Sequence, residues 1–172
     1  MIRLARPADR PAIDAVISAA FGRTDEAELV NRLRADEDVM FELVAEEAGE
    51  IAGHILYSRL WADRAELYAA LAPLAVHPDR QKSGLGSALV RASLDTGREF
   101  GCHGVLVLGD PAYYGRFGFS ADAARQVGAP YRGLAAFQAL ALEDGAFTAA
   151  MSVGYPDAFT GGPSEPLQAE PL

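Results

Sequence analysis

The sequence predicts an α/β (α+β) fold, in which helices flank a single mixed β-sheet. Apolar residues recur at helical spacing in residues 7–21 and again in residues 84–101. Short apolar or alternating runs, bounded by glycine and proline, lie between and after these segments and are typical of strands. The length of 172 residues, with 50% hydrophobic and 23% charged residues, is that of one ordinary globular domain.

The N-terminal part predicts one short strand and two helices. Residues 2–6 alternate in polarity like a strand, and residues 7–21 follow with an amphipathic helical pattern. Thr24 is a favourable capping residue, and Asp25 and Glu26 would place negative charge in the first turn of the next helix. We therefore expect a second helix to begin there.

The middle of the chain predicts an antiparallel hairpin and a third strand. Residues 41–60 contain two strand patterns around a turn at Ala48-Gly49-Glu50. Residues 66–76 are mostly apolar and form the next predicted strand, but Pro73 lies within it. Proline donates no hydrogen bond to a sheet and belongs at an edge or a bulge, so we expect this strand to be disturbed at Pro73.

A long helix, a buried strand and a short helix follow in that order. Residues 84–101 predict the helix, and residues 104–110 are apolar almost throughout, as in a strand covered on both faces. Residues 111–119 predict a short helix that Pro111 opens and Gly118 ends.

The C-terminal part predicts two strands and a tail. The strand patterns are residues 136–143 and 147–155, around a turn at Asp144-Gly145. Residues 160–172 are rich in proline and glycine and are predicted to be a disordered tail. We expect one domain over residues 1–159.

Bulk properties exclude several classes of protein. The net charge of −9 argues against nucleic acid as a partner and slightly favours a cationic substrate. No apolar run reaches the length of a membrane span, and the N-terminus does not resemble a signal peptide. The single Cys102 has no partner for a disulfide or a metal site, so no metal is expected and a reducing, cytoplasmic location is predicted.

The segment VHPDRQKSGLGSALV, residues 76–90, is the strongest candidate for a binding site. Glycines directly before a helix let an anion approach the unpaired amides and the positive end of the helix dipole. The P-loop motif does not fit, because Lys82-Ser83 precedes Gly84 instead of following a second glycine. The dinucleotide motif G-x-G-x-x-G does not fit, because Leu89 occupies its last glycine position. A tight turn without a ligand is the alternative.

What remains is a Q-x-x-G-x-G pattern formed by Gln81, Gly84 and Gly86, after a strand that contains proline. The segment LAPLAVHPDRQKSGLGSALV resembles the acyl-coenzyme A binding motif of the GNAT superfamily of N-acetyltransferases. VLVLGDPAYYGRFGF resembles the strand and short helix that follow it. Together with YRGLAAFQALALEDG and GYPDAF, these blocks suit a YhbS-like branch of bacterial acetyltransferases.

The resemblance implies a GNAT-like acyl-CoA N-acyltransferase fold with a mostly antiparallel sheet, and acetyl-CoA as co-substrate. The pantetheine arm would pair with the end of the strand that contains Pro73, and the pyrophosphate would lie on the amides of residues 81–87. Arg80 and Lys82 would neutralise phosphate charge or remain solvated. The implied cofactor-binding residues are Leu74, Ala75, Val76, Gln81, Lys82, Ser83, Gly84, Leu85, Gly86, Ser87, Tyr113 and Arg116.

For catalysis, the resemblance aligns Tyr114 with the tyrosine that protonates the leaving thiolate, with packing as its alternative role. The base is not evident from the sequence. Asp110 would either reach a cleft and act as the base or cap the following helix. His54 would either act as a base or be a structural residue. Glu66 lies too far back along its strand to reach the reacting groups. Tyr114 and Asp110 are therefore the candidate catalytic residues.

The predicted function is transfer of an acetyl group from acetyl-CoA to a primary amine of a small molecule or peptide, by direct attack in a ternary complex. An acyl-CoA-binding sensor or structural domain without transfer is the main alternative, and another kind of nucleotide-binding domain is the second. Acceptor specificity is expected in loops near residues 20–35 and 120–135. The sequence is compatible with a monomer or a homodimer, and no membrane association is expected.

Overall fold

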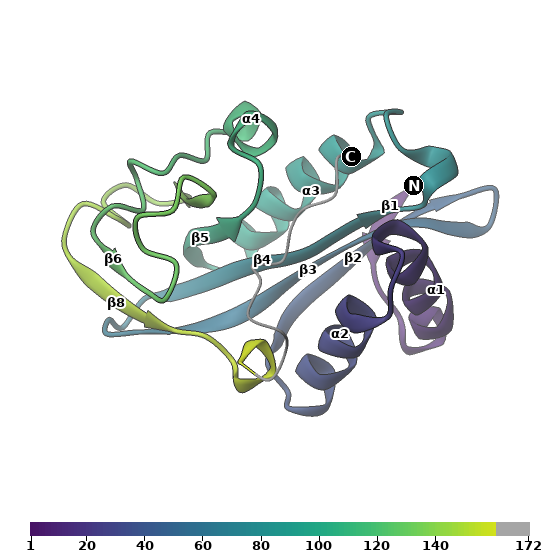
Figure 1. Ribbon diagram of the computed structural model, residues 1–172, viewed down its shortest axis with the longest axis horizontal. Coiled ribbons are helices and arrows are strands. Elements are labelled where there is room, and N and C mark those ends of the chain that lie inside the picture. Colours follow the sequence, from purple (N-terminus) through teal and green to yellow (C-terminus); the bar gives the residue numbers. More distant parts are fainter. Residues whose placement is uncertain (161–172) are drawn as a thin grey trace.

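A mixed β-sheet forms the centre of the computed structural model, which describes residues 1–160 (Figure 1). The strands are β1 (Ile2–Leu4), β2 (Val39–Glu47), β3 (Glu50–Ala62), β4 (Leu67–Val76), β5 (Cys102–Leu108), β6 (Val127–Gly128), β7 (Phe137–Ala141) and β8 (Met151–Gly154). The helices are α1 (Arg10–Phe21), α2 (Asp25–Ala35), α3 (Leu85–Glu99) and α4 (Pro111–Tyr114). Short 3₁₀ turns are η1 (Pro7–Asp9), η2 (Pro78–Arg80), η3 (Gly115–Phe117) and η4 (Asp157–Phe159).

The strands lie in the order β1-β2-β3-β4-β5-β7, with β8 beside β3 and β6 beside β8. Neighbouring strands are antiparallel, except that β4 runs parallel to β5 and β6 runs parallel to β8. The parallel pair β4–β5 is connected through α3, as a parallel crossover requires. The predicted mixed, mostly antiparallel sheet is confirmed.

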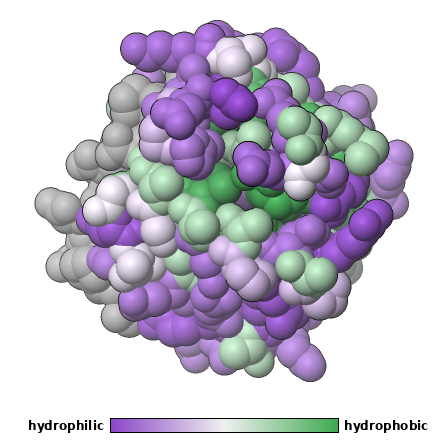
Figure 2. All heavy atoms as spheres, turned by 90° about the vertical axis from the view of Figure 1, so that its right-hand side faces the viewer, coloured by the Kyte–Doolittle hydropathy of each residue, from purple (hydrophilic) through white to green (hydrophobic). Residues whose placement is uncertain are grey.

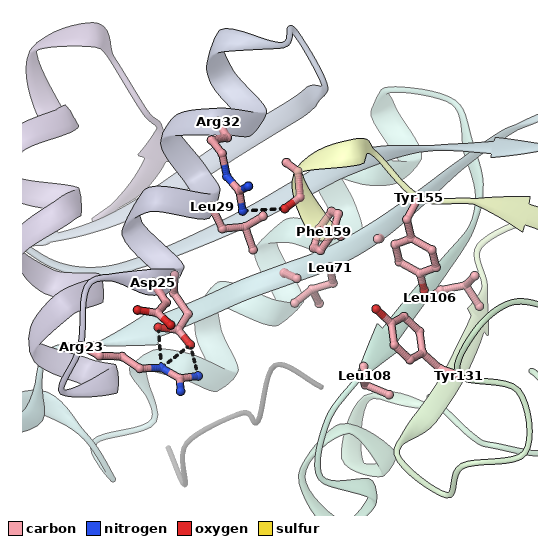
Figure 3. A pocket seen from close by; sticks show the side chains of 14 residues that line it. Arg23, Asp25, Leu29, Arg32, Leu71, Leu106, Leu108, Tyr131, Tyr155 and Phe159 are labelled. Carbon is pink, nitrogen blue, oxygen red and sulfur yellow. Dashed lines mark hydrogen bonds and ion pairs between the residues drawn. The ribbon is translucent and has the colours of Figure 1, made fainter. Parts of the chain in front are cut away.

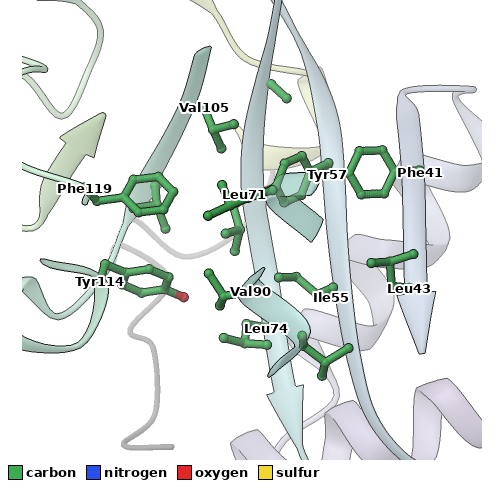
Figure 4. Close-up of a cluster of buried hydrophobic side chains, with 14 of the residues drawn as sticks. Phe41, Leu43, Ile55, Tyr57, Leu71, Leu74, Val90, Val105, Tyr114 and Phe119 are labelled. Carbon is green, nitrogen blue, oxygen red and sulfur yellow. The ribbon is translucent and has the colours of Figure 1, made fainter. Parts of the chain in front are cut away.

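Helices cover both faces of this sheet (Figure 1). On one face α1 and α2 bury Val44, Leu56 and Ala75. On the other face α3 packs on a cluster that includes Ile55 and Tyr57 (Figure 4). Successive side chains of β3 therefore point to opposite cores, which explains why its sequence is apolar without alternation.

The second predicted helix begins where expected, but Thr24 does not cap it with its side chain. Thr24 occupies the N-cap position in a helical conformation, and its hydroxyl donates to the carboxylate of Glu28 at 2.9 Å. A residue with helical dihedrals points its side chain away from the first amides, so the hydroxyl finds another partner. The acids of the first turn, Asp25 and Glu26, remain favourably placed for the helix dipole.

The predicted hairpin is present as β2 and β3. Ala48 and Gly49 form its two-residue turn with φ of 51° and 83°. Positive φ at both central residues is what a type I′ turn requires, and this turn matches the twist of the flanking strands.

β4 is disturbed at Pro73, as predicted. Ala72 and Pro73, joined by a cis peptide bond, together face the single Leu56 of β3, so the strand carries a bulge. Its pairing with β5 ends at Leu71↔Val107, although β4 itself continues beyond that point. The two central strands consequently diverge.

The two C-terminal strands do not form the expected pair. β7 pairs with β5, whereas β8 pairs with β3 and β6 and covers only the last part of the predicted strand 147–155. Phe147 explains the difference, because its ring is buried 5.5 Å from the ring of Tyr68. A Cβ on Gly104 would lie 2.5 Å from that ring, so the missing side chain provides the space. The segment before β8 thus anchors in the core instead of extending.

Within residues 1–160, no helix combines the length and the apolar character needed to cross a bilayer. The same residues contain no group of three or more side chains suited to hold a metal ion. The predicted disordered tail at 160–172 lies outside the described residues, apart from Thr160, which closes η4.

Candidate active site

The loop between β4 and α3 is held by local hydrogen bonds. The Gln81 side-chain amide donates to the backbone carbonyl of Val76 at 3.1 Å, which ties the loop to the end of β4. Lys82 and Gly84 both have positive φ, 60° and 86°. Gly84 adopts this conformation without strain, and it delivers the chain directly into α3.

The N-terminus of α3 presents free amides to this loop. The first bond of the helix joins the amide of Ala88 to the carbonyl of Gly84 at 3.0 Å. The amides of Leu85, Gly86 and Ser87 precede that bond and have no carbonyl of the helix behind them. Together with the helix dipole they form a site suited to an anion.

A cavity of about 290 Å³ lies in front of these amides. It is lined by Val76, Arg80, Gln81, Lys82, Gly84, Gly86, Ser87, Tyr113 and Arg116. Of its three basic residues, Arg80 pairs with Glu47 at 3.1 Å and Arg116 lies over the ring of Tyr113 at 4.5 Å. The structure thus brings most of the predicted cofactor-binding residues around one positively charged cavity.

Four predicted cofactor-binding residues are not part of this lining. Leu74 and Ala75 are buried in β4, between the bulge and the cavity. Ser83 donates its hydroxyl to the carbonyl of Arg80, and Leu85 packs against the α3 core. In this structure the side chains of Ser83 and Leu85 therefore shape the loop.

Tyr114 is buried at the other end of this region, next to the divergence of β4 and β5. Its ring packs edge-on against Tyr113 at 5.1 Å and Phe119 at 5.7 Å. Figure 4 shows its hydroxyl directed toward Leu74 and Val90. Burial raises the pKa of the Tyr114 phenol, so the group keeps its proton.

Asp110 has the structural role that the sequence left open. Its carboxylate accepts a hydrogen bond from the amide of Ala112 at 2.9 Å and caps α4. It is exposed and lines neither this cavity nor the second cavity described below. The geometry offers no support for Asp110 as a base.

His54 belongs to a buried polar group on the α1–α2 side of the sheet. Its Nε2 lies 2.7 Å from the Oε2 atom of Glu42. The two carboxylate oxygens of Glu42 also accept one hydrogen bond each from Arg34. Burial lowers the pKa of His54 and favours the neutral ring. His54 therefore packs as a structural residue and lines neither of the two cavities.

A second cavity, of about 100 Å³, lies where β4 and β5 diverge, on the α2 side (Figure 3). It is lined by Arg23, Asp25, Glu26, Leu29, Arg32, Ala70, Leu71, Ala72, Leu106, Leu108, Tyr131, Tyr155, Ala158 and Phe159. Its floor includes the bulge residue Ala72 and the last residues of β5. We call it the α2 cleft.

Arg23, just before α2, and the α2 side chains Glu26 and Arg32 hold two walls of the α2 cleft. Arg23 donates from Nε to Glu26 at 3.0 Å and pairs with it through Nη2 at 2.5 Å. Arg32 donates to the backbone carbonyl of Ala158 at 2.7 Å and so fixes η4 against α2 (Figure 3). The turn η4 is thereby tied to the helix across the cleft.

The opposite wall of the α2 cleft is aromatic. Tyr131 and Tyr155 lie with ring centroids 5.5 Å apart, and Tyr155 packs on Phe159 at 5.6 Å, both nearly edge-on. Burial raises the pKa of Tyr155, which stays a neutral phenol. These rings face the leucines of β4 and β5 in Figure 3.

The sequence predicted part of this second cavity. Of the two ranges expected to set acceptor specificity, residues 20–35 supply its α2 side and residues 120–135 supply Tyr131, but the aromatic wall also needs Tyr155 and Phe159. No local pattern indicates these two residues, because η4 reaches α2 only through the folded sheet. From the sequence, Glu26 is predicted only to be an acid in the first turn of a helix.

Figure 2 views the molecule from the right-hand side of Figure 1. Hydrophobic atoms lie in a central depression on this face, and hydrophilic atoms surround them.

In this fold, two parallel strands diverge. A helix N-terminus preceded by glycine lies on one side of the gap, and a second cleft lies on the other. This arrangement is typical of an acyltransferase. Residues 10–119 match the acetyltransferase (GNAT) family. The matched range extends from α1 through the helix α4 and includes the loop before α3. The chain belongs to the GNAT acetyltransferase family.

Relatives support this assignment over nearly the whole described chain. The uncharacterized N-acetyltransferase YhbS of Escherichia coli K12 is 38% identical over 149 residues, which cover 85% of this chain and 89% of that protein. The crystal structure of E. coli YhbS in complex with CoA has a TM-score of 0.87 at 35% identity and covers 93% of this chain and 91% of that one. A GNAT acetyltransferase from Brucella melitensis, in complex with acetyl-CoA, has a TM-score of 0.77 at 37% identity and covers 92% and 97%. The resemblance inferred from the two motif blocks is confirmed.

Proposed function

We propose that this protein transfers the acetyl group of acetyl-CoA to a primary amine by direct attack in a ternary complex. The observation that carries the proposal is the end of β4–β5 pairing at Leu71↔Val107, with one cavity on each side of the gap. Two ligands that enter from opposite sides can meet there without a covalent enzyme intermediate. The complexes of the two relatives with CoA and acetyl-CoA support the choice of donor.

The cofactor would bind along the loop before α3. Its pyrophosphate would accept hydrogen bonds from the amides of residues 81–87, with Lys82 and Arg116 adding positive charge. The pantetheine arm would pair with the backbone of Leu74, Ala75 and Val76, in the place that β5 leaves empty. The thioester would then reach the bulge in β4.

The chemistry needs a neutral amine, a stabilised oxyanion and a proton for the thiolate. The amine nitrogen attacks the thioester carbon, the C–N bond forms, and the C–S bond breaks as the tetrahedral intermediate collapses. A backbone amide of β4 near the bulge would stabilise the oxyanion. Tyr114 would donate its proton to the departing thiolate, and a thiolate formed in the same apolar surroundings is a stronger base than in water.

Titration calorimetry with acetyl-CoA, with ATP and NAD as controls, tests the donor. Saturable binding of acetyl-CoA alone is expected, and preferential binding of ATP or NAD would overturn the proposal. Initial rates of thiol release, with acetyl-CoA and an amine varied together, test the ternary complex. Intersecting double-reciprocal lines support direct attack, whereas parallel lines indicate a covalent intermediate. Binding without amine-dependent thiol release would identify an acyl-CoA-binding domain instead.

A further inference from the structure

An amine acceptor must lose a proton before it can attack. A primary amine such as that of lysine has a pKa of about 10.4 in water and arrives as an ammonium ion at neutral pH. The ion loses one proton before the attack and a second as the amide forms. Tyr114, whose proton goes to the thiolate, can regain one of the two, so the site requires a separate acceptor for the other.

The α2 cleft holds two carboxylates among the residues that line it, Asp25 and Glu26. Asp25 is exposed, but the side chain of Glu26 is fully buried. Glu26 lies in the first turn of α2, and the same cleft includes Ala72 at the bulge. Glu26 is therefore the carboxylate that a molecule inside the cleft can meet out of contact with solvent.

The groups around Glu26 determine what can approach it. Arg23 binds the carboxylate directly, and Arg32 is engaged by the carbonyl of η4. The remaining titratable groups of the cleft are Asp25 and the phenols of Tyr131 and Tyr155. An entering ammonium ion can share or replace Arg23 as the partner of the carboxylate, because the Arg23 side chain is 46% exposed and can extend into solvent.

The rest of the cleft is suited to an apolar group. Tyr131, Tyr155 and Phe159 form one wall, and leucines of α2, β4 and β5 form the floor. Such a lining favours an acceptor whose carbon skeleton is aromatic or aliphatic, because each buried methylene contributes about 0.8 kcal/mol.

We propose that the α2 cleft takes a primary amine carried on an apolar stem, and that Glu26 accepts the proton which this amine must lose. The inference rests on the proposed acetyl transfer. The ammonium ion gives one proton to the Glu26 carboxylate, and the neutral amine attacks the thioester carbon. The second proton on nitrogen replaces the one that Tyr114 gave to the thiolate, and Glu26 finally releases its proton to solvent.

The acceptor class is tested with 2-phenylethylamine and spermidine as probe amines and the full-length protein. We expect the higher kcat/KM with 2-phenylethylamine. A preference for spermidine, or acetylation of spermidine but not of 2-phenylethylamine, overturns this inference. Protein that binds acetyl-CoA but acetylates neither amine is an acyl-CoA-binding domain and overturns the proposed function. Protein that fails to bind acetyl-CoA also overturns the proposed function, so the two failures are distinguishable.

The role of Glu26 is tested with Glu26→Gln and the best acetylated probe amine. We expect kcat near pH 7.5 to fall ~10²–10⁴-fold, the usual contribution of a general base, with unchanged affinity for acetyl-CoA. The loss should shrink toward pH 10, where the amine becomes neutral without help. An equal loss at all pH values, or no loss, would overturn the assignment of Glu26 as the proton acceptor.

Glu28→Gln is the matched control, because Glu28 lies in the same helical turn, is exposed and is absent from the lining of the α2 cleft. It should retain the wild-type pH profile. If Glu26→Gln does not fold, Glu26→Asp keeps the carboxylate and should show partial activity with the wild-type pH profile. A Glu26→Asp profile that rises with pH like that of a protein without a base would also contradict the assignment.

Discussion

Replacement of Tyr114 by phenylalanine separates catalysis from packing. The ring is 2% exposed and contacts Tyr113 and Phe119, so its shape must be kept. Among the described residues, the Tyr114 hydroxyl has no hydrogen-bond partner. Tyr114→Phe therefore removes a proton donor and leaves every ring contact in place.

The expected effects of Tyr114→Phe on the free energy of unfolding and on kcat differ widely. The free energy of unfolding should change by less than about 1 kcal/mol, because no hydrogen bond among residues 1–160 is lost. The value of kcat should fall by about 10²-fold or more, which corresponds to about 3 kcal/mol in the barrier, because thiolate departure loses its acid. Since burial raises the pKa of Tyr114, the wild-type rate should not decline through pH 10 from ionisation of this phenol.

Thiol release under saturating acetyl-CoA and amine measures kcat, and urea unfolding measures stability. Tyr57→Phe is the matched control in the same core. It loses the 3.1 Å hydrogen bond between the Tyr57 and Ser93 hydroxyls, and the Ser93 hydroxyl can still donate to the carbonyl of Val90. It should lose about 1 kcal/mol of stability and no activity. Tyr114→Phe with wild-type kcat would refute the catalytic role.

Three further predictions concern stability and reactivity. Burial raises the pKa of Glu42, but hydrogen bonds from His54 of β3 and Arg34 of α2 lower it to about 2, below the ordinary 4.5. The ionised carboxylate therefore contributes about 3 kcal/mol to the free energy of unfolding above pH 4.5, and this contribution is lost as the pH falls toward 2. Glu42→Gln should accordingly lower the urea midpoint at neutral pH and reduce its fall between pH 4.5 and 2, and a variant as acid-sensitive as the wild type would contradict this. Burial raises the pKa of the Cys102 thiol to about 11, so a disulfide reagent at pH 8 should label it only after denaturation. Gly104→Ala should cost ~1–3 kcal/mol in urea unfolding because its Cβ would meet the ring of Phe147 at 2.5 Å, whereas Gly115→Ala, with open space, should cost much less.

Local patterns predict most of the elements. The helical spacing in residues 84–101, the turn at Ala48-Gly49 and the disturbance at Pro73 each depend on a few neighbouring residues, and each is present in the fold. The pairing of the C-terminal strands was wrong because it depends on Phe147 inserting beside Gly104, a contact between distant segments that no local pattern encodes.

The two cavities of the candidate site also differ in whether a local sequence pattern predicts them. The loop before α3 is contiguous in sequence, so its glycines and Gln81 predict an anion site directly. The α2 cleft is assembled from α2, both diverging strands and η4, and the burial of Glu26 follows only from that assembly. The binding and catalytic roles, the cytoplasmic location, the single domain at 1–159, the absence of nucleic acid as a partner and the monomeric or dimeric state stay predictions.

The hydrogen bond from Arg32 to Ala158 has a consequence for how such an enzyme can diversify. One wall of the α2 cleft, the acceptor site proposed above, includes the single turn η4, which is attached to α2 and lies outside the β4–β5 pair. Substitutions in this turn can reshape the α2 cleft while the loop before α3, on the other side of the sheet, keeps its geometry. Acceptor preference can therefore change between relatives through a terminal segment, at little risk to donor binding or to the core.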